Sequence, residues 1–313
     1  MDALILGRTA DRLSPDIGDY PGGIIIPVDK PYRWTSADVI RKIKFTAIRH
    51  FGKKNLKVGH AGTLDPLATG VLLVCIGNAT KLAESLQAHD KEYVAGITFG
   101  ATTPSYDLEK EIDRTFPHSH ITEDAVREAL KGFLGEQDQI APLFSAKSVD
   151  GVRAYELARK LYREGHRDLD EDSPIRASRI VISSLELLKF RESTAGEITG
   201  KAMQEDGNAM QEGGNAAGTI PEADRQTTPQ TVSKASSRIN VTDNSHLGLP
   251  EALIRIECSK GTYIRAFARD LGEALGSGAH LSSLQRSRSG DFQICNALSV
   301  SEALSLLSSG ESL

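Results

Sequence analysis

The hydrophobic and polar positions of the chain follow a two-residue period in several short segments, as expected of β-strands. Val71–Ile76 is instead a continuous apolar run after a glycine-rich loop, which is typical of a strand buried on both faces. Residues 252–259 alternate apolar and charged side chains and predict a half-buried strand. The same criteria predict further strands at residues 24–26, 91–100 and 177–190.

Apolar side chains recur at intervals of three and four in other segments, which is the spacing of amphipathic helices. Residues 262–275 show it most clearly, and Gly276 directly follows this segment as a helix-ending residue. A second helix is expected to end at Gly165. The residues expected to cap helices at their N-termini are Ser36, Thr122 and Thr262.

Residues 193–249 differ in composition from the rest of the chain, because small and polar residues predominate and large apolar side chains are rare. Such a segment cannot bury enough apolar surface to offset the entropy lost on ordering, so we predict a disordered insertion. Residues 1–22 contain Gly, Pro and Asp without periodicity and predict a loose N-terminal tail. The remaining chain, residues 23–313, is then one domain interrupted by the insertion.

The overall composition is that of an ordinary globular protein, and 313 residues suffice for two average domains or one large α/β domain. The three cysteines lie far apart without metal-ligand spacing, so we expect neither disulfides nor a metal site. The N-terminus does not resemble a signal peptide, and no apolar run approaches the roughly 18 residues of a membrane helix. These features predict a soluble protein of the cytoplasm.

The net charge of −5 argues weakly against a nucleic-acid partner, but the charges are unevenly distributed. Residues 30–83 carry ten basic and two acidic side chains, an excess of eight positive charges. Acidic residues predominate from residue 84 to residue 140. A positive face can therefore lie beside a functional site on an acidic protein. A solvated helix face explains the same pattern, and charge alone leaves both interpretations open.

The segment HAGTLDPLATG, residues 60–70, brings together one histidine, two glycines and one carboxylate. Asp65 precedes a proline and can cap one helical turn, which is a common structural use of such a residue. A chemical role is the alternative, because glycines let the backbone approach a large ligand closely and the loop adjoins the basic segment. His60 is open to the same two interpretations.

A second candidate is CSKGTYIR, residues 258–265. Arg265 falls in the first turn of the predicted helix, where the helix dipole disfavours a cation unless an anion lies close to it. A solvated arginine is the simpler alternative. Tyr263 beside it, and Tyr93 in KEYVAGITFG, are either core aromatics or a stacking face for a flat ligand.

Together these segments resemble the TruB family of tRNA pseudouridine synthases, whose members isomerise the T-loop uridine-55. The block GHAGTLDPLATGVLLVCIGNATKL carries the resemblance, and IIIPVDKP, KEYVAGITFGATT, FSAKSVDGVRAYELARK and CSKGTYIRAFARDLGEALG occur in the family's order. The resemblance implies an α+β pseudouridine-synthase fold: a mixed, mainly antiparallel sheet flanked by helices and loops. Residues 144–165, here called the thumb, resemble the insertion that closes over the tRNA T-arm.

The resemblance also implies roles for individual residues. Asp65 matches the family's catalytic aspartate, and Arg265 matches the arginine paired with it. Tyr93 matches the tyrosine that packs on the target base, and Tyr263 matches its neighbour in the active site. Two further positions are expected to bind substrate: His60, which matches a histidine that helps to hold the flipped-out nucleotide, and Lys30 of the DKP block.

The chain departs from the family pattern in three places. The acidic stretch of the family is ATTPSYDLEK here, which keeps Asp107, and Gln285 replaces a basic residue in LQRSR. We also expect the C-terminal RNA-binding PUA domain of many relatives to be absent. The first two departures affect expected RNA contacts more than chemistry.

The implied reaction breaks the N1–C1′ bond of a uridine and joins C5 to C1′. It needs one ionised carboxylate but no cofactor and no metal, and tRNA is the only partner expected of a monomer. Two alternatives share the scaffold: a non-catalytic RNA-folding protein, which would lack these site residues, and a synthase that depends on a guide RNA and partner proteins. A glycosidase would need a second carboxylate opposite the first.

Overall fold

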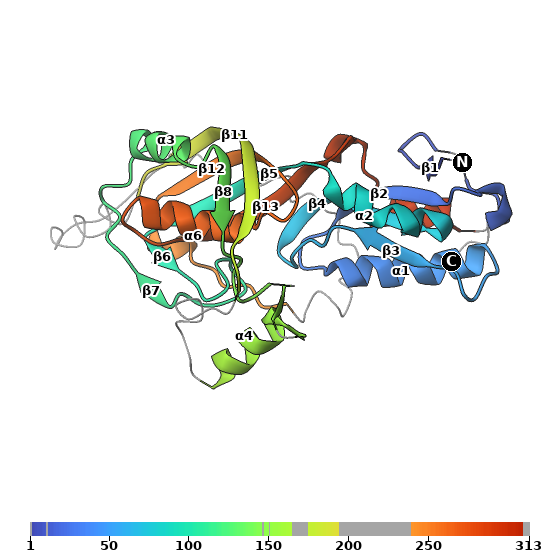
Figure 1. The fold of residues 1–313 in the computed structure, drawn as a ribbon, viewed down its shortest axis with the longest axis horizontal. Helices are drawn as coiled ribbons and strands as arrows, with labels where there is room; N and C mark the ends of the chain where they lie inside the picture. Colours follow the sequence, from blue (N-terminus) through green and yellow to red (C-terminus); the bar gives the residue numbers. More distant parts are fainter. Residues whose placement is uncertain are drawn as a thin grey trace, which may run out of the picture.

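The computed structural model describes residues 2–10, 12–145, 147–149, 151–164, 175–193 and 239–308. Its centre is a ten-stranded sheet in the order β1-β2-β4-β13-β5-β12-β11-β8, with β3 beside β4 and β14 beside β13 (Figure 1). The pairs β1–β2 and β4–β13 are parallel and the other pairs in this sheet are antiparallel. The expected mixed, mainly antiparallel α+β architecture is confirmed.

The strands of the large sheet are β1 (Leu4–Ile5), β2 (Ile24–Lys30), β3 (Val58–Ala61), β4 (Ala68–Ile76), β5 (Lys91–Phe99), β8 (Gly135–Gln139), β11 (Ser178–Arg191), β12 (Glu251–Cys258), β13 (Ala279–Ser289) and β14 (Phe292–Gln293). Two small hairpins pair β6 (Ala101–Thr102) with β7 (Arg114–Thr115) and β9 (Ser148–Val149) with β10 (Val152–Arg153). The described helices are α1 (Ser36–His50), α2 (Ala83–Ala88), α3 (Glu123–Lys131), α4 (Ala154–Arg163), α6 (Ile264–Ala274) and α7 (Val300–Leu306). Short 3-10 helices are η1 (Ile17–Asp19), η2 (Gly77–Leu82), η4 (Ser245–Leu247) and η5 (Ile294–Asn296).

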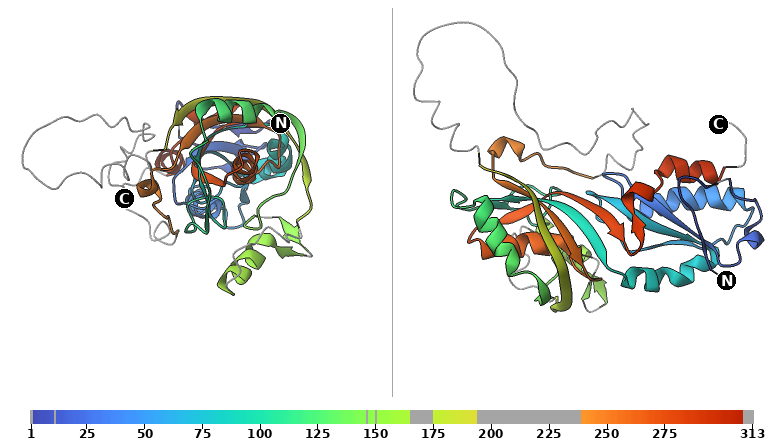
Figure 2. Two further views of the ribbon diagram at one scale, coloured as in Figure 1. Left: turned by 90° about the vertical axis from the view of Figure 1, so that its left-hand side faces the viewer. Right: turned by 90° about the horizontal axis from the view of Figure 1, so that it is seen from above.

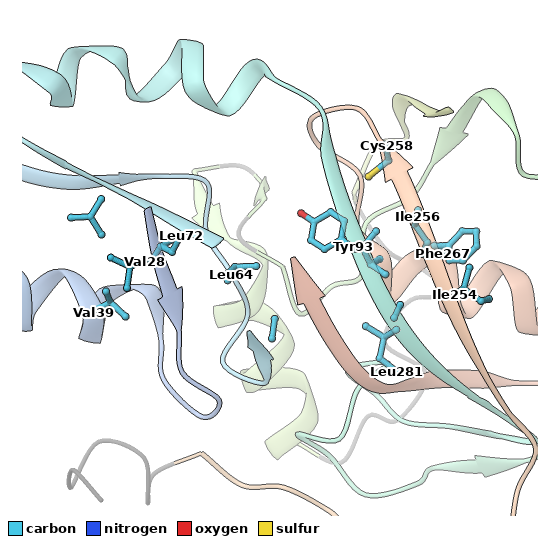
Figure 3. Close-up of a cluster of buried hydrophobic side chains, with 14 of the residues drawn as sticks. Val28, Val39, Leu64, Leu72, Tyr93, Ile254, Ile256, Cys258, Phe267 and Leu281 are labelled. Carbon is cyan, nitrogen blue, oxygen red and sulfur yellow. The ribbon is translucent and has the colours of Figure 1, made fainter. Parts of the chain in front are cut away.

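Strand β4 is buried on both faces, as its continuous apolar run predicts. Leu72 faces the core under α1, whereas Leu73 faces a second cluster that includes Leu86 of α2. Helices α1 and α2 accordingly lie on opposite sides of β2 and β4 (Figure 2). In the other half of the sheet, Phe267 of α6 packs on Ile254 and its neighbours (Figure 3). The site described below lies where these two halves meet.

The structure corrects several predicted helix starts. Thr35 rather than Ser36 caps α1, in a capping box with Asp38. Thr122 caps α3 as expected, although this helix already ends at Lys131. Tyr263 rather than Thr262 precedes α6, because the Thr262 hydroxyl donates to the Ser259 carbonyl oxygen instead.

The N-terminal residues pack more closely than the expected loose tail. Leu4 and Ile5 pair with β2, and the Leu6 amide donates to the Ile25 carbonyl oxygen at 2.9 Å. The Leu6 side chain is buried, so this apolar residue anchors a segment that has no periodicity of its own. No described helix has both the length and the apolar character needed to cross a membrane.

Most of the predicted insertion, residues 194–238, lies outside the described residues. Its described end packs against the domain: the Thr242 amide donates to the Leu108 carbonyl oxygen at 2.8 Å, and Leu249 is buried. Arg33 donates from Nη2 to the Ile239 carbonyl oxygen at 2.7 Å. The predicted boundary at residue 249 is therefore about ten residues too late, because turn-forming residues conceal these backbone contacts in the sequence.

Candidate active site

Asp65 lies in the loop that joins β3 to β4. The Ala68 amide donates to the Asp65 carbonyl oxygen at 3.1 Å, which closes a tight turn over Pro66. The chain then enters β4 at Ala68, so the predicted helical turn is absent. Gly70 follows with φ 99°, and a Cβ there would lie 2.2 Å from the Arg286 carbonyl oxygen. Only glycine fits this position, which brings the loop against β13.

Arg265 is the second residue of α6, and its guanidinium holds Asp65 with two hydrogen bonds. Nε donates to Oδ2 at 2.9 Å and Nη2 to Oδ1 at 3.2 Å. The remaining donors reach the Ser105 carbonyl oxygen from Nη1 at 3.1 Å and the Phe144 carbonyl oxygen from Nη2 at 2.8 Å. The side chain of Arg265 is 6% exposed and that of Asp65 is 37% exposed. The predicted pair therefore exists, with the arginine buried and the carboxylate accessible.

A second carboxylate lies behind this pair. Asp107 Oδ2 is 3.9 Å from Arg265 Nε, and Asp107 Oδ1 accepts hydrogen bonds from the Ser105 hydroxyl and the Glu109 amide. Burial raises the pKa of Asp107, and the charge of Arg265 opposes that rise. Burial alone would lower the pKa of Arg265, but Asp65 and Asp107 raise it above its ordinary value. The guanidinium is thus fixed in its charged form.

Asp65 and Arg265 open into a cavity between the β3–β4 loop and β13. The other residues that line it are Tyr32, Leu67, Ala68, Asp107, Leu108, Leu281, Ser282, Ser283 and Leu284. Tyr32 is 46% exposed, and no pattern in the sequence indicated that it would lie here. Apolar walls around one accessible carboxylate are suited to a flat ring that meets a single charged group.

Tyr93 and Tyr263 lie beside this cavity rather than among the residues that line it. Tyr93 is buried in β5, in register with Arg286 of β13 on one side and Ile256 of β12 on the other. Tyr263 packs against the small apolar cluster of the thumb, next to Phe144 and others. Burial raises the pKa of both phenols, and the negative charge of Asp65 adds to the rise. Both rings are therefore neutral neighbours of the carboxylate.

Lys30 is completely buried, which differs from the expected substrate contact. Its ammonium group donates to three carbonyl oxygens, those of Pro31 at 2.9 Å, Trp34 at 2.5 Å and Pro66 at 3.3 Å. Burial lowers the pKa of Lys30 to about 7, and the nearby carboxylates of Asp65 and Asp29 oppose that shift. Because its donors are used within the protein, Lys30 positions the backbone just after Asp65.

Arg286 of β13 is a further buried cation, for which no sequence pattern had predicted a role. It is 2% exposed and donates from Nε to the Val71 carbonyl oxygen at 2.7 Å and from Nη2 to the Gly62 carbonyl oxygen at 3.1 Å. His60 on β3 is half-buried, and burial and the charge of Arg286 lower its pKa. Its imidazole is thus neutral at pH 7 and contributes no charge to the loop.

Comparison with known proteins agrees with this geometry. Residues 49–210 match the family model described as TruB family pseudouridylate synthase (N terminal domain). Proteins named tRNA pseudouridine synthase B are similar over most of the chain. One from Phocaeicola vulgatus is 43% identical and covers 90% of this chain and 92% of its own. One from Flavobacterium johnsoniae is 38% identical and covers 90% and 95%.

The chain belongs to the TruB family. A solved structure of an H/ACA RNP bound to a substrate RNA containing 2′-deoxyuridine shares the fold, with a TM-score of 0.50 at 20% identity. That alignment covers 97% of this chain and 60% of the other. The expected pseudouridine-synthase fold is thus confirmed.

The thumb of this TruB family member contains the β9–β10 hairpin and α4. Ala154 and Ala158 of α4 pack with Phe144 and with Leu143, which lies just before the thumb, so a small apolar cluster anchors the thumb to the rest of the protein. Lys110 Nζ lies 4.9 Å from the ring centroid of Tyr162, so a cation–π contact joins α4 of the thumb to the loop between β6 and β7. The Phe144 carbonyl oxygen accepts a hydrogen bond from Arg265 and therefore connects the thumb to the Asp65–Arg265 pair.

Proposed function

We propose that the chain is a tRNA pseudouridine synthase that converts the T-loop uridine-55 to pseudouridine, with Asp65 as its one catalytic carboxylate. The observation that carries this proposal is the buried Arg265 fork, which leaves one face of the Asp65 carboxylate open to the cavity. Family membership and the names of the relatives support the same activity.

The nucleotide has to leave the folded loop before its glycosidic bond can meet Asp65, so base flipping is part of the proposal. Tyr32 and the apolar residues of the cavity offer the displaced base a surface to pack on. Tyr93 and Tyr263 lie beside the same site, as the family resemblance implies. His60 lies on β3, the strand before the Asp65 loop, where a histidine can contact the ribose or the base.

The reaction is an isomerisation. The N1–C1′ bond breaks, the uracil turns over, C5 bonds to C1′, and C5 loses its proton while N1 gains one. Asp65 can serve by attacking C1′, by adding to C6 or by removing the C2′ proton, and each role requires an ionised carboxylate. Arg265 holds that carboxylate in place, because its Nε and Nη2 donors bind both carboxylate oxygens and fix the orientation of the group.

We further propose that the protein acts as a monomer in the cytoplasm, without an obligate protein partner, on the T-arm held under the thumb. The exposed basic side chains of α4, Arg159, Lys160 and Arg163, support this placement because they would meet phosphates.

The test is to incubate an unmodified tRNA transcript with the purified protein alone and to map pseudouridine along the RNA. We expect one product, at the T-loop uridine. Modification at another position would overturn the assignment of the substrate site, and a requirement for added RNA or protein would favour the guide-dependent alternative. A T-arm hairpin assayed in parallel shows whether this arm is a sufficient substrate.

A further inference from the structure

The outer face of α1 and the loop after it form a basic surface, defined here as the α1 surface. Its exposed members are Arg41, Lys42, Lys44, Phe45, Arg49, Lys53, Lys54 and Lys57. Among the described residues, Arg41 is the one member with an ion pair, to Asp38 at 2.7 Å. The other cations have no carboxylate partner in the described ranges, so their charge is available to an external anion.

Phe45 gives this surface a second property. Its side chain is 64% exposed, the largest value among the exposed large hydrophobic residues of the described chain. The Arg49 guanidinium lies 5.7 Å from the centroid of its ring. An isolated aromatic ring amid lysines and arginines is too small for a protein interface, but it is the combination that stacks on a nucleic-acid base.

The α1 surface is joined rigidly to the active site. The Ser36 hydroxyl at the start of α1 accepts from the Leu64 amide at 3.0 Å and donates to the Leu64 carbonyl oxygen at 3.2 Å. Leu64 directly precedes Asp65, so the helix begins beside the catalytic loop. Fifteen residues of α-helix then carry the surface roughly 22 Å away from it.

In the view of Figure 1, α1 and helix α4 of the thumb both lie along the lower edge of the molecule. An RNA hairpin held under the thumb, with one base at Asp65, would have the rest of its molecule on this side. The far end of the α1 surface lies roughly 22 Å along the helix from the Asp65 loop.

We propose that the α1 surface is a second RNA-binding surface, which contacts the part of the tRNA outside the T-arm. Its lysines and arginines bind phosphates, and Phe45 stacks on an unpaired base. This inference rests on the proposed function, because it takes tRNA as the substrate. It explains how a protein with net charge −5 binds a polyanion: the positive surface that binds the RNA phosphates lies well away from the catalytic carboxylate.

The test compares two RNAs, a full-length unmodified tRNA transcript and the isolated T-arm hairpin. Binding affinity and steady-state kinetics are measured for wild type, Phe45→Ala, Phe45→Tyr and the double variant Lys42→Ala/Arg49→Ala. The matched control is Arg127→Ala/Lys131→Ala, which removes two exposed basic side chains from α3. Thermal unfolding of each variant shows whether it keeps the wild-type fold.

We expect Lys42→Ala/Arg49→Ala to weaken binding of the full tRNA about fivefold or more and to lower the salt dependence by roughly one to two counterions. KM should rise while kcat stays unchanged, and binding of the hairpin should change less than about twofold, since it lacks the phosphates concerned. Phe45→Ala should weaken tRNA binding in the same way, and Phe45→Tyr, which keeps the ring, should restore it.

Equal weakening for both RNAs, no weakening for either, or the same loss in the α3 control would overturn the inference. Loss of stability in the variants without selective loss of tRNA binding would also overturn it, by assigning the surface a structural role. Because the binding measurement needs no turnover, it remains informative if the chain modifies another uridine. Absence of tRNA binding by the wild type would instead refute the proposed function.

Discussion

The Asp65 carboxylate and the Arg265 guanidinium face each other as a two-pronged ion pair, with Nε–Oδ2 and Nη2–Oδ1 distances of 2.9 and 3.2 Å. Four of the five N–H groups of the guanidinium donate within the protein, to Asp65 and to the Ser105 and Phe144 carbonyl oxygens. The arginine is therefore a fixed support, and the carboxylate is the partner free to react.

Asp65→Asn should abolish pseudouridine formation while leaving tRNA affinity within about twofold of wild type. The amide keeps the shape of the side chain but cannot act as a nucleophile or base. Single-turnover assays and a binding titration measure the two effects, with Asp138→Asn on the exposed face of β8 as the control. Retention of turnover within about tenfold of wild type, a cost below roughly 1.4 kcal/mol, would contradict the catalytic role.

Arg265→Lys should lower kcat by more than about tenfold, although the charge is retained. A lysine cannot supply two parallel donors to Asp65 together with two donors to backbone carbonyl oxygens. The free energy of unfolding should fall by about 2–4 kcal/mol, because buried acceptors lose their partners. The same change in an exposed pair, Arg255→Lys opposite Glu186, should cost less than about 1 kcal/mol. Similar costs at both sites would contradict this account.

Lys30→Met should destabilise the protein by about 3 kcal/mol and reduce turnover, since the carbonyl oxygens of Trp34 and Pro66 lose the donor that Lys30 supplies inside the protein. The folded-state pKa of Lys30, about 7, lies below the ordinary 10.5. Between these values the unfolded chain binds more protons than the folded protein, so the stability contributed by Lys30 rises with pH. The difference in the free energy of unfolding between wild type and variant, measured with denaturant, should be larger at pH 9 than at pH 7. A constant or smaller difference would refute the lowered pKa of Lys30.

Gly70→Ala should cost at least about 2 kcal/mol of stability and much of the activity. A Cβ there meets the Arg286 carbonyl oxygen at 2.2 Å and the residue has φ 99°, so strain and collision combine. Gly52→Ala is the matched control, because Gly52 has φ 60° but no atom within 4 Å of an added Cβ. Its cost should stay near 1 kcal/mol. Equal melting temperatures of the two variants would show that β13 moves to make room for the added methyl group.

Two deletions test the predicted insertion and its described end separately. Replacement of residues 195–237 with a short Gly/Ser linker should leave melting temperature and activity nearly unchanged, as its composition predicts. Replacement of residues 194–245 also removes the Ile239 and Thr242 contacts to the loops of Arg33 and Leu108, and it should lower both. A large loss from the shorter deletion would show that the segment packs on the domain.

Local sequence patterns predicted the central strands and α6 well, because each buries one periodic set of apolar side chains. Strand β4 is the clearest case, and its apolar run alone indicated burial on both faces. The N-terminal strand β1 escaped prediction because two residues carry no periodicity and pair only with a partner twenty residues away. The predicted helix caps are displaced by one residue at α1, where the Thr35 side chain takes the capping position, and at α6, where the Thr262 hydroxyl donates to the Ser259 carbonyl oxygen instead.

The site was predictable where a residue breaks a local rule. Arg265 in a first helical turn implies an anion, and Asp65 supplies it. Lys30 and Arg286 broke no local rule, because their acceptors are carbonyl oxygens brought together only by the folded chain. Tyr32 was equally hidden, since its place in the cavity depends on the loop that Lys30 holds. Burial of a cation in a backbone cage leaves no mark in a single sequence.

The parallel pairing of β13 with β4 has a consequence for how the protein is made. Residues 284–286 are the seam between the N-terminal strands and the strands from β5 onward, and they are synthesised more than 200 residues after β4. A nascent chain contains Asp65 long before it contains Arg265. The two halves of the sheet remain unjoined until residues 284–286 leave the ribosome. The complete sheet around the Asp65 loop is thus postponed until residues 284–286 have been made, and a chain that stops before them carries the aspartate without the strand that joins the two halves.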